Sequence, residues 1–390
     1  MIVHLPGLDV DVRVPHEWQP VPDEDLHRFV HPSGLQLTIR HFDGERGRLD
    51  VAVLPAEEVA SAPAPRLAFT SAHPLIGWFG GASGEVVAVT PDGPVLARQR
   101  RGFTVGSPTE ASLFPEPLVV VPGHPLTSVW IVEPSAGDLL DLPAEPSWVP
   151  ERRHVPWGDE IALRLPDGVV SGVPYQELDD GFLLVGEPGL HVAEVGGPTG
   201  ISRLEVGWHR DWGELVAEAS EDAPDDLWCH LATLGPEVDV DTFDVRLARA
   251  IERPTIWSAL AAAHGAQLGL CGIDEARRLA QEVLPDADVP TRVALLARGL
   301  TEVSSLVGVQ LGRVAYDGLL RFGLGRVMSD YPEGAERWLV PGWFWVAGMG
   351  ETPLAARVGG MLARAHARAL CRASESRDPE AVAWLSLFAG

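Results

Sequence analysis

Two patterns of hydrophobic and polar positions divide this chain of 390 residues. In the first 210 residues, short runs of alternating apolar and polar residues predict half-buried strands. The clearest is 35–42 (Leu-Gln-Leu-Thr-Ile-Arg-His-Phe), which follows the turn signal Pro32-Ser33-Gly34. Beyond residue 246 the apolar residues recur at helical spacing instead. The pattern predicts an α+β protein in which a β-rich N-terminal half, of one or two small antiparallel domains, precedes an all-α helical domain.

Local signals place the starts of several helices. Thr242 and Thr255 are plausible N-caps, and Asp288 with Pro290 opens a helix over 291–306. An Ala- and Arg-rich helix is expected over 353–373. Asp378 and the two residues after it predict a last helix.

Composition sharpens the division, because 26 of the 34 prolines lie in the first 230 residues. We expect five segments from these shifts. They are a β-rich domain (1–138), a proline-rich linker (139–158), a second β-rich segment (159–210), an acidic linker (211–245) and an all-α helical domain (246–390).

The chain contains no lysine and no asparagine, so all 30 basic side chains are arginine. This excludes a P-loop, a protein kinase site and a pyridoxal phosphate enzyme, each of which needs one of these residues. Codons for both missing residues are AT-rich, which indicates a GC-rich, bacterial source. Three widely spaced cysteines argue against a disulfide framework. We expect a cytoplasmic protein with no cofactor.

The formal net charge is −25 and is unevenly spread. Residues 1–210 carry 29 acidic and 14 arginine side chains, residues 211–245 carry 11 acidic and no basic ones, and the remainder is nearly balanced. A negative field repels nucleic acid and anionic membranes. No apolar run is long enough to span a bilayer. The charge favours a basic protein partner, or it serves solubility alone.

Four residues are candidate metal ligands. His27 and His31 are four apart, the spacing that places two ligands on one helix face, and His41 and Asp43 could complete a zinc site across a hairpin. Pro32 would end such a helix at once. The alternative is two surface histidines in a polar turn.

Two arginine clusters stand out in the acidic front half. They are Arg98, Arg100 and Arg101 at a strand end, and Arg152, Arg153 and His154 in the predicted proline-rich linker. Arginine binds carboxylate and phosphate groups through paired N–H donors, so either cluster could ligate an anion. The alternative is that both offset neighbouring acids.

Two further features suggest a partner surface. The acidic stretch offers a docking strip for a basic protein, through Asp222, Asp225, Asp226, Asp239 and Asp241. Trp343 and Trp345 follow Pro341-Gly342 and could form an interface; the alternative is that they pack in the core. Arg100 and Arg101 complete the candidate partner-binding residues.

Three functions remain open. The favoured one is a non-catalytic, acidic protein-binding module (an adaptor, a chaperone-like protein or an immunity-type protein) that recognises a basic partner, because no catalytic set is complete in the sequence. The second is a metal-assisted hydrolase built on His27, His31, His41 and Asp43. The third is a structural subunit of a larger protein assembly. An oligomer is compatible with this function.

Overall fold

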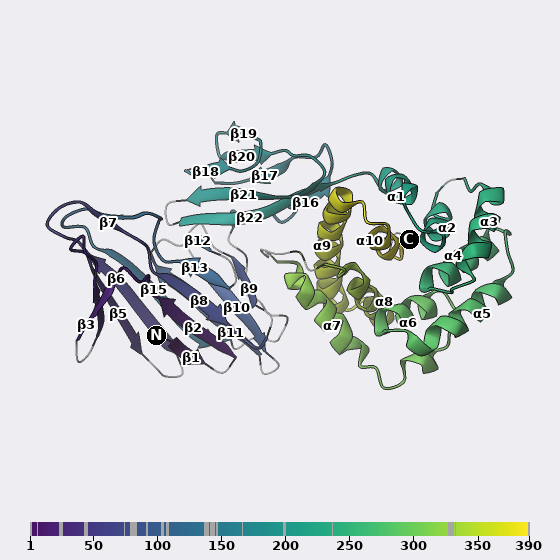
Figure 1. The fold of residues 1–390 in the computed structure, drawn as a ribbon, viewed down its shortest axis with the longest axis horizontal. Helices are drawn as coiled ribbons and strands as arrows, with labels where there is room; N and C mark the ends of the chain where they lie inside the picture. Colours follow the sequence, from purple (N-terminus) through teal and green to yellow (C-terminus); the bar gives the residue numbers. More distant parts are fainter. Residues whose placement is uncertain are drawn as a thin grey trace.

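A computed structural model gives the fold of the chain (Figure 1). It describes all residues except 1, 6, 23–25, 43–45, 74, 79–83, 91–92, 103–104, 107–108, 136–139, 141–144, 146, 166, 198–199, 236, 327–330, 332 and 389–390. The α+β prediction is confirmed, since the strands precede a C-terminal helical region.

The front of the chain is a β-sandwich with its own core. One antiparallel sheet has the order β1 (Ile2–Leu5), β2 (Leu8–Arg13), β8 (Arg66–Thr70), β13 (Glu110–Ser112) and β12 (Val105–Gly106). The facing sheet has the order β3 (Gln19–Val21), β4 (His27–Val30), β5 (Gln36–Phe42), β6 (Gly47–Leu54), β15 (Leu126–Pro134), β11 (Gly93–Arg101), β10 (Glu85–Thr90) and β9 (Leu75–Trp78). The pair β7 (Ala60–Ala62) and β14 (Leu118–Val120) lies beside them.

Strand β5 shows how the pattern builds this sandwich. Leu37 and Ile39 are buried, while Gln36 and Arg40 are exposed and Thr38 is half-buried, as the period of two requires. Between the sheets, the rings of Phe69 and Trp130 lie 5.7 Å apart. The strand predicted at 35–42 is therefore confirmed.

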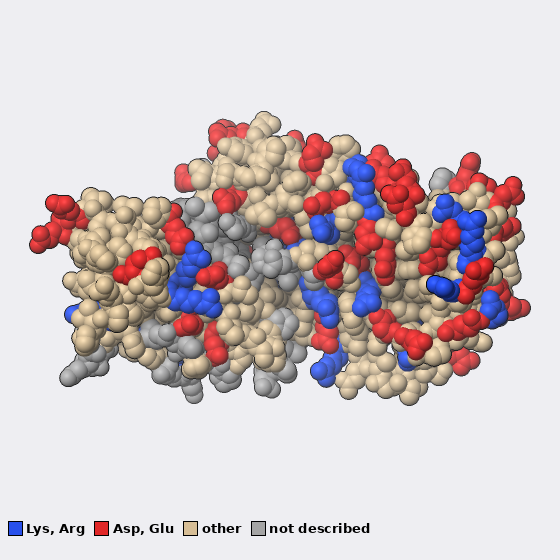
Figure 2. Space-filling view, in the orientation of Figure 1, with Lys and Arg blue, Asp and Glu red and all other residues tan. Residues whose placement is uncertain are grey.

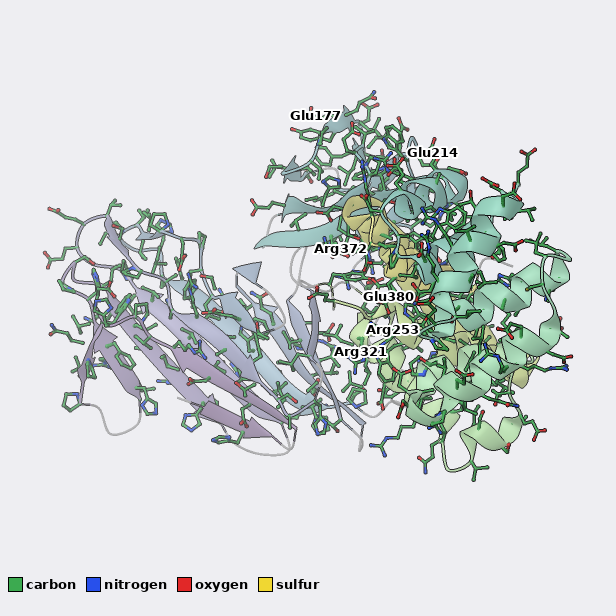
Figure 3. The ribbon with its side chains drawn as sticks, turned by 45° about the vertical axis from the view of Figure 1, so that its right-hand side comes forward. Glu177, Glu214, Arg253, Arg321, Arg372 and Glu380 are labelled. Atoms are coloured by element: carbon green, nitrogen blue, oxygen red, sulfur yellow. The ribbon has the colours of Figure 1, made fainter. Side chains whose placement is uncertain are left out.

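A second, smaller β-module follows and sits against the helices (Figure 1). One sheet has the order β16 (His154–Pro156), β22 (Gly200–His209), β21 (Gly189–Gly197) and β18 (Val169–Ser171), in which β16 runs parallel to β22. The other has the order β17 (Ile161–Leu163), β20 (Gly181–Leu184) and β19 (Tyr175–Leu178). Figure 3 shows Glu177 of β19 at the outer edge of this module.

The helical region occupies the other end of the molecule (Figure 1). Its α-helices are α1 (Trp212–Glu221), α2 (Asp225–Ala232), α3 (Val240–Ala250), α4 (Ile256–Gln267), α5 (Ile273–Val283), α6 (Val289–Ala297), α7 (Leu311–Arg321), α8 (Leu339–Met349), α9 (Pro353–Ser376) and α10 (Pro379–Ser386). Short 3₁₀ turns join them: η1 (Leu284–Asp286), η2 (Val303–Leu306), η3 (Gly323–Gly325) and η4 (Glu336–Trp338). Thr255 caps α4 and Asp288 caps α6, as their sequences predict.

The acidic stretch 211–245 is helical, which corrects its assignment as a linker. It forms α1, α2 and the first turns of α3. The N-cap of α3 is Asp239 and not the predicted Thr242. The Asp239 carboxylate accepts a hydrogen bond from the backbone N–H of Thr242. Acidic residues are favoured at helix N-termini, so a high acidic content is compatible with several short helices.

The small β-module and the helices share one hydrophobic core. Val206 and Trp208 of β22 belong to the same buried cluster as Met361 and Leu362 of α9, and Val87 of β10 reaches it from the sandwich. Helix α9 therefore packs against a sheet, which fixes the walls of the site described next. Among the helices that the structure describes, none combines the length and apolar character needed to cross a membrane.

Candidate functional site: an arginine-lined pocket

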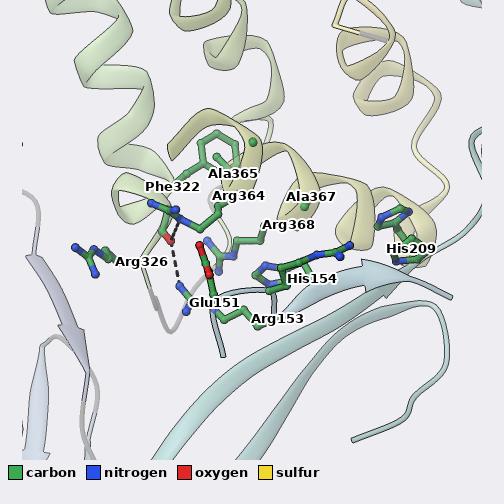
Figure 4. A pocket seen from close by; sticks show the side chains of 14 residues that line it. Glu151, Arg153, His154, His209, Phe322, Arg326, Arg364, Ala365, Ala367 and Arg368 are labelled. Carbon is green, nitrogen blue, oxygen red and sulfur yellow. Dashed lines mark hydrogen bonds between the residues drawn. The ribbon is translucent and has the colours of Figure 1, made fainter. Parts of the chain in front are cut away.

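The pocket lies between α9 and the β16–β22 ladder and has a volume of about 290 Å³ (Figure 4). We call it the arginine pocket, because five guanidinium groups line it. The residues that define it are Glu151, Arg152, Arg153 and His154 before and in β16, His209 of β22, Arg326 after η3, and Arg364 and Arg368 of α9.

Helix α9 presents its two arginines by helical periodicity. Arg364 and Arg368 are four residues apart and so share a face. Its close approach to the sheet depends on Gly207 of β22, where a Cβ atom would lie 2.9 Å from the side chain of Cys371. The small residue at this crossing allows the arginines to meet the residues of β16.

One end of the pocket gathers three guanidinium groups. The carbonyl oxygen of Gly325 accepts from Arg153 Nη2 at 3.0 Å and from Arg364 Nε at 3.1 Å, as dashed lines show in Figure 4. The Glu145 carboxylate lies 3.0 Å from Arg153 Nη2 and 3.5 Å from Arg326 Nη1. One carbonyl and one carboxylate thus hold three positive charges together.

This end retains N–H groups without partners. Arg153 is 4% exposed, yet its Nη1 finds no hydrogen-bond acceptor among the described residues, and the same is true of Arg326 Nε. Burial lowers the pKa of the Arg326 guanidinium; Glu145 opposes this effect, and neighbouring arginines add to it. Buried donors of this kind cost free energy unless an acceptor reaches them.

At the floor of the pocket, Arg368 and His154 contact a buried carboxylate, that of Glu205. Arg368 donates to both oxygens of Glu205 at 2.6 Å, and His154 Nε2 lies 3.1 Å from the same carboxylate. Burial alone would raise the pKa of Glu205, but the hydrogen bonds from His154 and Arg368 outweigh it and bring the pKa to about 2. Glu205 is therefore ionised and neutralises Arg368.

His154 is the neutral member of this group. Burial lowers the pKa of its imidazole, although Glu205 partly opposes that effect. Because an ionised Glu205 accepts a hydrogen bond, His154 Nε2 carries the proton and Nδ1 carries the lone pair. The pocket thus joins a positive end, suited to an anionic group, to a neutral imidazole that can accept a hydrogen bond or a proton.

The four candidate metal ligands are not gathered into a site among the described residues. His27 lies in β4 and His41 in β5, with ring centroids 5.8 Å apart. His31 lies past the end of β4, where its Nδ1 bonds the Ser33 hydroxyl and its ring packs near Trp18. His27 and His31 share no helix, and Asp43 lies outside the described residues. Within the described ranges, no three His, Cys, Asp or Glu side chains are arranged to hold a metal ion.

Three of the acidic candidates for partner binding have structural roles. Asp225 pairs with Arg246 and Arg249 at 3.7 and 3.8 Å. Asp226 accepts from the Thr255 hydroxyl at 2.6 Å, and Asp239 caps α3. The other two, Asp222 and Asp241, lie exposed at the end of α1 and the start of α3. On the face shown in Figure 2, acidic side chains are interleaved with arginines over the helical region.

The remaining partner candidates are also placed by the structure. Trp343 and Trp345 lie in α8, half-buried against the main core, and the Trp343 ring is 6.0 Å from that of Phe388. Arg100 and Arg101 end β11, with Arg100 Nη2 3.9 Å from Glu133.

The sequence revealed one wall of the arginine pocket, the triplet Arg152, Arg153 and His154. It did not reveal Glu205, Arg326, Arg364 or Arg368, which come from segments far apart in the chain. The four-residue spacing of the two α9 arginines was the one local signal available for them.

Comparisons with known proteins add little to this site. No protein-family model matches the chain, and no curated protein matches it in sequence. A solved structure of a polysaccharide lyase is similar in its chain course, with a TM-score of 0.48 and 12% identity, over 93% of this chain and 75% of that one. This likeness is too distant to assign an activity.

Proposed function

We propose that the protein binds an anionic organic ligand, carrying a carboxylate or phosphate group, in the arginine pocket. The single observation that carries the proposal is the convergence of Arg153, Arg326 and Arg364 around one carbonyl and one carboxylate, with buried N–H groups left over. A ligand anion would offset the mutual repulsion of these guanidinium groups, whose paired N–H donors suit carboxylate and phosphate oxygens.

Nearby carboxylates offset only part of the positive charge of the pocket. Glu205 pairs with Arg368, and Glu145 pairs with Arg153 and Arg326, whereas five arginines line the pocket and Glu151 is the one acidic residue among its described lining residues. The pocket lies where the β-module meets the helical region, a common location for ligand sites.

Calorimetric titration at low ionic strength tests the proposal with inorganic phosphate and citrate, and with glycerol as the neutral probe. We expect the anions to bind and glycerol to give no heat. Arg364→Gln and Arg152→Gln should each weaken binding by roughly tenfold or more, the range of a charged hydrogen bond.

The matched control is Arg277→Gln on α5, which removes the same charge from a side chain that is 56% exposed. It should leave anion binding unchanged. Failure of both anions to bind at millimolar concentration would overturn the proposal, as would an equal loss in the control.

Recognition of a basic protein partner stays a separate prediction. Its sequence basis is the net charge and the acidic stretch. The structural roles of Asp225, Asp226 and Asp239 leave fewer acidic side chains for such a partner than the sequence suggested.

A further inference from the structure

A second concave site lies in the small β-module, and its charge is opposite to that of the arginine pocket. It is a groove of about 380 Å³ between the turn after β16 and the loop joining β20 to β21. We call it the Trp157 groove; its lining includes Trp157, Asp159, Pro174, Gly186, Glu187 and His191.

The groove is held rigidly on one buried side chain. Trp208 is fully buried, and its indole Nε1 donates to the carbonyl oxygen of Asp159 at 2.9 Å. Gly186 rests on the same indole, since a Cβ atom there would lie 2.3 Å from the ring. His191 packs edge-on to Trp208 at 5.6 Å and donates through Nε2 to the Glu187 carbonyl oxygen at 2.8 Å. Both walls are thus fixed before any ligand arrives.

The chemistry of the lining selects a cation. Trp157 is 50% exposed, which is unusual for so large an aromatic side chain. Asp159 and Glu187, both exposed, are the acidic residues of the lining, and no arginine is among the described residues that line the groove. An anion would meet repulsion there, whereas a positive group would meet two carboxylates and an aromatic face.

The same indole lies within cation–π range of a guanidinium group of the protein itself. Arg210, which is not among the residues lining the groove, places its guanidinium carbon 5.9 Å from the Trp157 ring centroid, and its charge is offset by Glu218 at 3.3 Å. A guanidinium or alkylammonium group is therefore suited to this aromatic ring.

We propose that the Trp157 groove binds an organic cation, a guanidinium or alkylammonium group, with its charge near Asp159 and Glu187 and its carbon skeleton on Trp157 and Pro174. Such a group comes either from a free small molecule or from an arginine or lysine side chain of another protein. The inference is independent of anion binding in the arginine pocket.

Ligand-observed NMR titration of the full chain tests this inference. The probes are choline, methylguanidinium and the neutral isostere of choline, 3,3-dimethylbutan-1-ol. We expect both cations to bind at least tenfold more tightly than the isostere. Trp157→Ala and the pair Asp159→Asn with Glu187→Gln should each abolish that preference.

The control is Asp274→Asn on α5, a carboxylate whose side chain is 96% exposed and which should not affect binding. Glu187→Gln alone, a surface change, guards against misfolding of Trp157→Ala. Equal binding of the isostere, or cation binding that survives every groove variant, would overturn the inference. A short peptide containing arginine distinguishes the sources: tighter binding than methylguanidinium indicates a protein side chain, and weaker binding indicates a free cation.

Discussion

At the scale of single residues, the buried pair of Arg368 and Glu205 illustrates how the site and the fold depend on one another. Each group is almost fully buried, so each charge is tolerated only because the other is present. The pair also sets the state of His154, since an ionised Glu205 holds the imidazole proton on Nε2. A substitution of Glu205 should therefore affect the free energy of unfolding more than it affects ligand binding.

We predict that Glu205→Gln lowers the free energy of unfolding by about 3–5 kcal/mol, because it leaves the Arg368 charge buried without a counter-ion. Urea unfolding followed by circular dichroism measures this change. The matched control is Glu375→Gln. The Glu375 side chain also pairs with an arginine of α9, Arg372, but it is 50% exposed. The control should cost less than ~1 kcal/mol. Similar losses in the two variants would contradict a special role for the buried pair.

At the same scale, the sequence could identify arginines that are adjacent in the chain but not those that meet through folding. Because Arg152 and Arg153 are neighbours, the sequence indicates them as a possible anion site. It does not indicate Arg364, because nothing local shows that its guanidinium reaches the carbonyl of Gly325. Glu205 sits in a strand pattern that looks ordinary in sequence, and only its burial beside α9 gives it a role.

At the scale of elements, the approach of α9 to β22 decides whether the pocket exists. Gly207 permits that approach, while Gly359 lies inside the N-terminal half of α9, with nothing closer than 3.9 Å to an added Cβ atom. A substitution at Gly207 therefore tests close packing between α9 and the sheet. A substitution at Gly359 tests helix propensity alone.

We predict that Gly207→Ala destabilises the protein by ~1–3 kcal/mol and weakens anion binding, because the methyl group would lie 2.9 Å from Cys371 of α9 and 2.9 Å from the Gly189 carbonyl oxygen of β21. Gly359→Ala should instead stabilise it by up to ~1 kcal/mol through helix propensity, with binding unchanged. Thermal unfolding and phosphate titration of both variants provide the measurement. Tolerance of the alanine at residue 207 in both assays would show that the crossing is looser than the structure indicates.

The sequence largely predicts which segments form helices or strands. It does not predict which segments the folded core buries. The periodicity of β5 and the caps Thr255 and Asp288 are predictable because these signals are local. The prediction of a linker over the acidic stretch is wrong, since the charge there obscures the apolar positions Leu215 and Leu227, which are buried in the core. Charge density alone does not distinguish a solvated loop from the exposed faces of short helices.

At the scale of the whole molecule, three histidines of the helical region link stability to pH: the buried His230 and His264 and the half-buried His366. Burial, with help from His264 and Arg298, lowers the pKa of His230 to about 3. Burial also lowers the pKa values of His264 and His366 to about 4, with help from Arg298 and His209 respectively. In the unfolded chain each would titrate near pH 6.5. The unfolded state thus binds more protons than the folded state between pH 6.5 and 4.

Because stability rises with pH wherever the unfolded state binds more protons, we predict that the free energy of unfolding falls as the pH drops from 6.5 towards 4. Each such histidine contributes up to roughly 1.4 kcal/mol per pH unit in that window. Urea unfolding at pH 7, 6 and 5 measures the slope, which His230→Gln should reduce. His16→Gln, at a side chain that is 93% exposed, should leave the slope unchanged. Stability that is flat from pH 6 to 5 would mean that these imidazoles gain protons in the folded state, and hence that water reaches this part of the core.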